Sequence, residues 1–192
     1  MKAFTDWIKK IGILGVFAII ILITAYLYEL QSQKVINIQI GTKNENTVYK
    51  YYTVNKVIDG DTLSITMDGV SEKIRLIGIN TPETVDPRTP VQCFGKEASS
   101  RMKDLAEDNL IRLEYDDTQG TRDVYNRILA YVYLEDGQML NRKMIAEGYA
   151  YEYTYLTPYK YQKEFRELQT LARTSARGLW SSNTCHGSKL FN

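Results

Sequence analysis

Residues 63–79 read LSITMDGVSEKIRLIGI, and this stretch decides the fold because it predicts two strands joined by a tight turn. The strands are Leu63–Met67 and Lys73–Ile79, both rich in apolar and β-branched residues. Asp68-Gly69 between them is a dipeptide preferred in two-residue hairpin turns. We therefore expect an antiparallel hairpin near the start of the folded domain.

The segments on either side of the hairpin complete the order of a small barrel. A strand rich in Tyr, Val and Thr precedes the hairpin, and a loop marked by prolines follows it. Three strands, a helix and two strands is the order of a five-stranded OB-fold. We predict an α+β domain at residues 48–192 with such a barrel and about three helices. The other predicted elements are strands at Val48–Ile58, Leu110–Tyr115 and Arg127–Leu134 and helices at Gly95–Asp108, Leu140–Glu147 and Pro158–Ala176.

The composition excludes several classes of enzyme. The chain has 192 residues, a net charge of +1, one histidine (His186) and two cysteines. A single histidine cannot build a multi-histidine zinc site, and two cysteines cannot build a zinc ribbon. A catalytic metal would therefore need mainly oxygen ligands, which points to Ca²⁺ or Mg²⁺.

The N-terminal segment predicts a membrane anchor. Residues 11–28 carry no charge and would span about 27 Å as a helix, close to the thickness of a hydrocarbon core. Lysines precede the run, so residues 1–10 are expected in the cytoplasm and the rest of the chain outside. A cleaved signal peptide, and a buried soluble helix, are the alternatives. Residues 29–47 are polar and predict a linker.

Three clusters of polar residues fall at predicted strand ends. They are Asp59-Gly60-Asp61-Thr62, Asn80-Thr81-Pro82-Glu83 after Arg75, and Asp123-Val124-Tyr125-Asn126-Arg127. Carboxylates that gather repel one another unless a cation lies among them, and guanidinium groups bind phosphate. Each cluster alone is more often a turn or a surface salt bridge. Together, a metal, two arginines and a carboxylate base describe a phosphodiesterase.

Five motifs in register make the sequence resemble the staphylococcal-type nuclease (thermonuclease) family over about Tyr51–Ser182. They lie at residues 57–62, 74–84, 95–99, 123–131 and 176–180. The resemblance implies a Ca²⁺-dependent endonuclease on an OB-fold that cleaves DNA and RNA, single- or double-stranded, to products ending in 3′-phosphate. No protein partner is implied.

The same resemblance implies roles for individual residues. Arg75, Glu83 and Arg127 match the catalytic positions, with Glu83 as the general base. Asp61, Asn80 and the Thr81 carbonyl match the calcium ligands, and Asp59 lies near the metal. Tyr125, Tyr153 and Tyr155 fall where the family has aromatic residues around the bound nucleotide.

Two departures from the family pattern affect the site. The family usually has Asp where this chain has Asn80, so the metal site loses one negative charge and we expect weaker calcium binding. Val124 and Asn126 replace a usual Lys and Gly in the loop before Arg127, and Val124 removes a basic contact.

The tyrosines and cysteines each allow two interpretations. Tyr149, Tyr151, Tyr153 and Tyr155 alternate, which fits either a stacking surface for bases or a half-buried strand. Cys93 and Cys185 would form a disulfide in an oxidising compartment, or else remain free or pair between molecules.

The leading hypothesis is a nuclease held at the cytoplasmic membrane by residues 11–28, with its domain outside. Secretion after signal cleavage is the alternative location. A non-catalytic nucleic-acid-binding OB module, supported by Asn80, and a purely structural OB domain on a stalk are the alternative functions.

Overall fold

A computed structural model of the protein describes residues 21–28, 49–84 and 90–188. The chain divides into two units, Met1–Val48 and Tyr49–Asn192, and each is described by itself. In the first unit, residues 21–28 are helical. The remainder of the predicted anchor and the whole predicted linker lie outside the described residues.

In residues 21–28, 49–84 and 90–188, no helix combines the length and the apolar character that a membrane crossing requires. The predicted anchor at residues 11–28 therefore stays a prediction.

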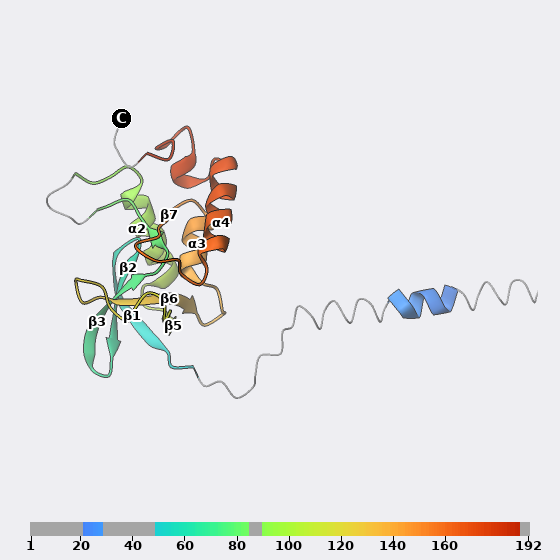
Figure 1. Ribbon diagram of the computed structural model, residues 1–192, viewed down its shortest axis with the longest axis horizontal. Coiled ribbons are helices and arrows are strands. Elements are labelled where there is room, and N and C mark those ends of the chain that lie inside the picture. The colour runs from blue at the N-terminus through green and yellow to red at the C-terminus, as the bar shows by residue number, and fades with distance from the viewer. Residues whose placement is uncertain (1–20, 29–48, 85–89, 189–192) are drawn as a thin grey trace, which may run out of the picture. The chain divides into compact units, whose positions relative to one another are not determined.

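Five strands of the second unit close into a barrel in the order β1-β2-β3-β6-β5 (Figure 1). Neighbouring strands are antiparallel except for β3 and β6, which run parallel. The predicted five-stranded barrel of OB type is confirmed. The strands are β1 (Tyr52–Asp59), β2 (Thr62–Met67), β3 (Val70–Leu76), β5 (Leu110–Glu114) and β6 (Ile128–Leu134).

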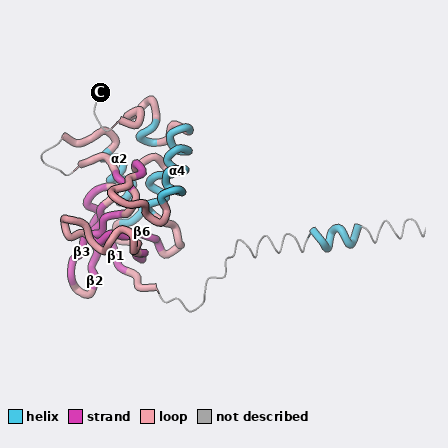
Figure 2. Tube along the Cα trace, viewed as in Figure 1, coloured by secondary structure: helices cyan, strands magenta, loops and turns pink. Residues whose placement is uncertain are grey.

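The β2–β3 hairpin forms where it was predicted. Met67 pairs with Val70, and Asp68 and Gly69 between them have φ values of 52° and 82°. Positive φ at both central residues is the requirement of a type I′ turn, which explains the Asp-Gly dipeptide. Figure 2 shows this hairpin at the end of the domain farther from α4 (Gln162–Thr174).

The predicted strand Lys73–Ile79 is wrong at its end, because the chain leaves the barrel after Leu76. Gly78 has a φ of 78°, which breaks the extended backbone. A Cβ at Gly78 would lie 2.6 Å from the ring of Tyr159, so the close approach also requires glycine. The next two residues form β4 (Ile79–Asn80), which pairs with β7 (Tyr151–Glu152) in a small second sheet. This pairing was not predicted.

The helices cover the barrel and share its core. α2 (Gly95–Ala106) buries Ala98, Met102 and Ala106 at helical spacing, and it ends two residues earlier than predicted. α3 (Leu140–Ala146) packs against α4, as Figure 1 shows. A short 3₁₀ helix, η1 (Gly178–Trp180), follows α4.

The last helix begins at Gln162 and not at the predicted Pro158. The reason lies in the turn before it, where the Lys160 N–H donates to the Asp116 carboxylate at 2.8 Å and the Tyr159 ring is buried. The contacts of these two residues hold the backbone in a turn, so the helix starts only after them. Phe165 and Ala172 are the residues that α4 buries in the core.

Candidate active site

The turn between β1 and β2 places a buried carboxylate at the mouth of the barrel. Asp61 is 5% exposed, and its Oδ2 accepts hydrogen bonds from the Thr81 backbone N–H at 2.8 Å and the Thr81 hydroxyl at 3.2 Å. A Cβ at Gly60 would lie 2.7 Å from the Thr81 side chain. The Asp-Gly-Asp sequence therefore lets the turn approach Thr81 closely enough for Asp61 to bind it.

Arg75 on β3 connects this carboxylate to Asn80. Its Nη1 donates to the backbone carbonyls of Leu76 and Ile79, both at 2.8 Å. Its Nη2 donates to Asn80 Oδ1 at 3.2 Å and lies 3.3 Å from Asp61 Oδ2. The irregular backbone after β3 thus fixes the guanidinium, and the guanidinium brings together two predicted metal ligands.

Asp59 is the last residue of β1 and begins the same turn. Its Oδ1 accepts a hydrogen bond from the Asp61 N–H at 3.1 Å. Burial, followed by the negative charge of Asp61, raises the pKa of the Asp59 carboxyl to about 7. Two neighbouring carboxylates repel each other when both are ionised. A cation bound between them would offset this repulsion, so the pair favours cation binding.

The donors at this turn fit a hard cation. Asp61, Asn80 and Thr81 offer carboxylate, amide and carbonyl oxygens, and oxygens of these types are the ligands that Ca²⁺ takes. In the described part of the chain no three His, Cys, Asp or Glu side chains form a group that could hold a metal, so the candidate ligands combine one carboxylate with amide and carbonyl oxygens. The Glu83 carboxylate accepts the Thr84 N–H at 2.8 Å.

Glu83 lies on the segment between the Asp61 contact and α2. Its N–H donates to Gln92 Oε1 at 3.0 Å, and its carbonyl accepts the Gln92 N–H at 2.9 Å. Because Thr81 is bound to Asp61, the backbone that carries Glu83 is fixed on both sides. The side chain of Glu83 is half-buried.

Arg127 reaches the site from the loop before β6. Asp123 organises this loop, since its carboxylate accepts the N–H groups of Tyr125 and Arg127 at 2.9 Å and the Arg127 Nε at 2.6 Å. Burial raises the pKa of Asp123, but the hydrogen bonds and charge from Arg127 outweigh it and the pKa lies below its usual value. Asn126 adopts a φ of 63°, a conformation that asparagine tolerates in place of glycine.

Thr62 links Arg127 to Asp61, a predicted metal ligand. The Thr62 hydroxyl donates to Asp61 Oδ1 at 3.0 Å, and Arg127 Nη1 approaches the same hydroxyl at 3.4 Å. Through Thr62 the structure brings Arg127 into the cluster formed by Asp61 and Arg75. Sequence reasoning missed Thr62, Asp123 and Gln92 as supporting residues, although the first two lie within quoted motifs.

The predicted nucleotide-binding tyrosines are exposed. Tyr125 is 75% exposed and lies 5.3 Å from the Arg127 guanidinium, measured to the ring centroid. The rings of Tyr153 and Tyr155 lie 6.4 Å apart, and the Tyr153 N–H donates to the Gly78 carbonyl beside β4. By contrast, Tyr149 and Tyr151 pack on protein rings, those of Phe94 and Trp180.

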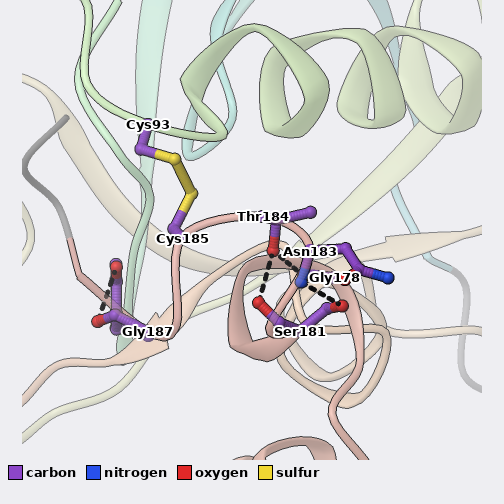
Figure 3. Close-up of a disulfide and its surroundings, with 8 residues drawn as sticks. Cys93, Gly178, Ser181, Asn183, Thr184, Cys185 and Gly187 are labelled. Carbon is purple, nitrogen blue, oxygen red and sulfur yellow. Dashed lines mark hydrogen bonds between the residues drawn. A yellow bond between two sulfur atoms is a disulfide. The ribbon is translucent and has the colours of Figure 1, made fainter. Parts of the chain in front are cut away.

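The two cysteines are joined in a disulfide, with their Cα atoms 5.9 Å apart. Figure 3 shows the bond between the segment preceding α2 and the turn that contains Thr184. The bond thus ties the chain just after Gln92 to the C-terminal end of the domain.

The end of the barrel carries Asp61 in a turn together with Arg75 and Arg127, and Glu83 lies on an adjoining loop. This combination of carboxylates and arginines is typical of a phosphodiesterase. Residues 73–182 match the family model described as staphylococcal nuclease homologue. The chain belongs to this family. The prediction of a phosphodiester-hydrolysing nuclease is confirmed by this membership.

Individual relatives agree with the family model. A thermonuclease of Staphylococcus hyicus is 42% identical over 143 residues, which cover 74% of this chain and 80% of the relative. A thermonuclease of Staphylococcus intermedius is 44% identical over 129 residues, which cover 67% and 75%. The endonuclease YncB of Bacillus subtilis is 35% identical over 141 residues, which cover 73% and 66%.

Proposed function

We propose that the protein is a calcium-dependent endonuclease that hydrolyses DNA and RNA to products ending in 3′-phosphate. The observation that carries this proposal is the contact cluster at the barrel mouth, where Asp61 binds Thr81 and Arg75 while Arg75 binds Asn80. A set of oxygen donors beside a fixed guanidinium is suited to a cation and a phosphate bound next to each other.

The proposed reaction uses this chain's residues to bind phosphate and to move a proton. Arg75 and Arg127 bind the phosphoryl oxygens and stabilise the charge that grows on them. Glu83 takes a proton from a water molecule whose oxygen attacks phosphorus. The bond from phosphorus to the 5′-oxygen breaks, the 5′-oxygen takes up a proton, and the phosphate stays on the 3′-oxygen. Asp61, Asn80 and the Thr81 carbonyl would hold Ca²⁺, which supplies further charge stabilisation.

The exposed tyrosines are proposed to contact the bases. Their rings are exposed to solvent and are not packed in the core. Tyr125 lies beside Arg127, and the rings of Tyr153 and Tyr155 lie next to each other. Stacking on such rings tolerates any base, which suits an enzyme that accepts both DNA and RNA. Residues 48–192 carry 19 Lys and Arg against 20 Asp and Glu, a net charge of −1, so phosphate binding is proposed to rest on local groups.

Cleavage of plasmid DNA and single-stranded RNA, with calcium or with a chelator, tests the proposal. We expect cleavage in millimolar calcium, none with the chelator, 3′-phosphate at the product ends and strong loss of activity in Glu83→Ala. A folded protein that binds these substrates in calcium but leaves them intact would contradict the proposal and favour a non-catalytic binding module.

The proposed location is the outer side of the cytoplasmic membrane, with residues 11–28 as the anchor. The disulfide supports a domain that lies in an oxidising compartment. Protease added to intact cells should remove the domain, and the anchored protein should fractionate with membranes. Recovery of the shortened protein in the medium would instead support signal cleavage.

A further inference from the structure

Gln92 holds the backbone of Glu83 through two hydrogen bonds. Gln92 Oε1 accepts the Glu83 N–H at 3.0 Å, and the Gln92 N–H donates to the Glu83 carbonyl at 2.9 Å. One bond uses the glutamine side chain and the other its main chain. Both peptide groups of Glu83 are therefore bound to the same residue.

The start of α2 presses against the same segment. The Gly95 N–H donates to the Gln92 carbonyl at 3.0 Å. A Cβ at Gly95 would lie 2.6 Å from the Thr84 side chain and 3.1 Å from the Glu83 carbonyl oxygen. Gln92 is thus fixed to a helix that is itself in close contact with the Glu83 segment.

The disulfide anchors the residue that follows Gln92. Cys93 is bonded to Cys185, which is 2% exposed. The partner segment is ordered by its own hydrogen bonds, because the Thr184 hydroxyl donates to the carbonyls of Gly178 at 2.7 Å and Ser181 at 3.0 Å (Figure 3). The bond therefore connects Gln92 to a folded part of the domain.

We propose that Gln92 is a positioning residue for Glu83, and that the Cys93–Cys185 disulfide holds Gln92 in place. The inference rests on the proposed function, in which Glu83 is the general base. In this arrangement Gln92 contacts neither substrate nor ion and acts only through Glu83. A shift of about 1 Å in a reacting group can lower a rate by up to about 100-fold, so a clamp on the backbone of the base affects the chemical step.

The test compares wild type, Gln92→Ala, Glu83→Ala and the double variant in steady-state cleavage of single-stranded DNA at fixed calcium. We expect Gln92→Ala to lower kcat about tenfold, with KM within about twofold of wild type. In the Glu83→Ala background the same substitution should change kcat little, because residues that act as a unit are not additive.

Gln119→Ala is the matched control. The Gln119 side chain also bonds the backbone of another segment, because its Nε2 donates to the Thr157 carbonyl at 3.1 Å. It should lose a similar amount of stability in thermal unfolding and keep its kcat. A drop in kcat equal to that of Gln92→Ala would overturn the proposal, since it would trace the effect to stability alone.

A double variant that lacks both cysteines tests the disulfide. Cys93→Ser/Cys185→Ser should lower kcat about tenfold without a matching rise in KM, and it should add little in the Glu83→Ala background. Circular dichroism at a temperature well below unfolding establishes that the variant is folded. If that variant does not fold, chemical reduction of the wild-type disulfide replaces it as the test. We expect reduction to cause the same loss of kcat.

The outcomes distinguish a failure of the proposed nuclease function from a failure of the proposed role of Gln92. Wild type that cleaves nothing overturns the proposed function and this inference with it. Wild type that cleaves, with Gln92→Ala equally active, overturns this inference alone. The inference is also overturned if Gln92→Ala loses as much activity in the Glu83→Ala background as in wild type.

Discussion

Asn80 sets the charge of the proposed metal site. Its Oδ1 accepts a hydrogen bond from Arg75, and Asp61 lies against the same guanidinium. The neutral amide leaves Arg75 with Asp61 as its charged contact, while the pKa of neighbouring Asp59 is raised to about 7 by burial and by Asp61. The site therefore offers less negative charge to a cation than a carboxylate at this position would give.

We predict that Asn80→Asp binds calcium about tenfold more tightly, because ligand charge tunes calcium affinity over several orders of magnitude. Isothermal titration of calcium into wild type and variant measures the change. Asn55→Asp is the control, since it adds the same charge on the exposed face of β1, where Asn55 donates to Thr66. Equal affinities of wild type and Asn80→Asp would contradict the prediction.

Local sequence explains how well single residues could be predicted. Asp61, Arg75 and Asn80 stand in motifs whose order the family resemblance supplies, and the structure brings them together. Gln92 carries no motif, and its contact with Glu83 depends on how the chain returns to the start of α2. Thr62 lies in a quoted motif, but its link to Arg127 requires the parallel pairing of β3 with β6.

At the scale of elements, the small sheet of β4 and β7 supports the barrel mouth. Asn80 pairs with Tyr151, so the strand that carries a predicted metal ligand is held by a segment far along the chain. Two-residue strands leave no periodic pattern, which is why this pairing could not be predicted while the β2–β3 hairpin could. The start of α4 was also missed, because contacts of Tyr159 and Lys160 override the helix signal of Pro158.

We predict that Gly78→Ala lowers the free energy of unfolding by about 2–4 kcal/mol, because the methyl group meets Tyr159 and the backbone has a φ of 78°. Gly69→Ala separates the two causes. Gly69 has a φ of 82° but nothing within 4 Å of a Cβ, so only about 1 kcal/mol is expected. Urea unfolding of both variants measures the difference, and equal losses would show that packing at Gly78 contributes nothing.

At the scale of the whole domain, Asp116 joins β5, β6 and the turn before α4. Its carboxylate accepts bonds from the Tyr131 hydroxyl at 2.7 Å and the Lys160 N–H at 2.8 Å, and Thr118 binds it as well. Burial raises the pKa of Asp116, but these hydrogen bonds outweigh it and hold the pKa below its usual value. Its contribution to stability is therefore complete above pH about 4 and is lost as pH falls through the folded-state pKa.

We predict that Asp116→Ala lowers the free energy of unfolding by about 2–4 kcal/mol at pH 7, since buried donors lose a charged acceptor. The difference in free energy of unfolding between wild type and Asp116→Ala should become smaller as the pH is lowered from 5 to 2. Denaturant unfolding at several pH values in this range measures it. Asp117→Ala, which replaces the exposed neighbouring residue, is the control. Its free energy of unfolding should stay close to that of wild type. A gap that is constant with pH would contradict the assignment.

The disulfide also acts on the whole domain, because it joins residues 92 positions apart. In the chain-entropy model such a loop contributes about 4–5 kcal/mol by restricting the unfolded state. We predict that Cys93→Ser/Cys185→Ser loses about this much in denaturant unfolding. A loss below about 1 kcal/mol would indicate that the bond does not constrain the unfolded chain.

The separation of the two cysteines also sets an order of events in time. A ribosome that adds about 5–20 residues per second needs about 5–20 s to pass from Cys93 to Cys185. During that interval Glu83 and Gln92 have already been synthesised, while the sulfur that secures them has not. A chain that is cut short before Cys185 never forms the bond. Only a domain synthesised through Cys185 can therefore complete the support of its proposed general base.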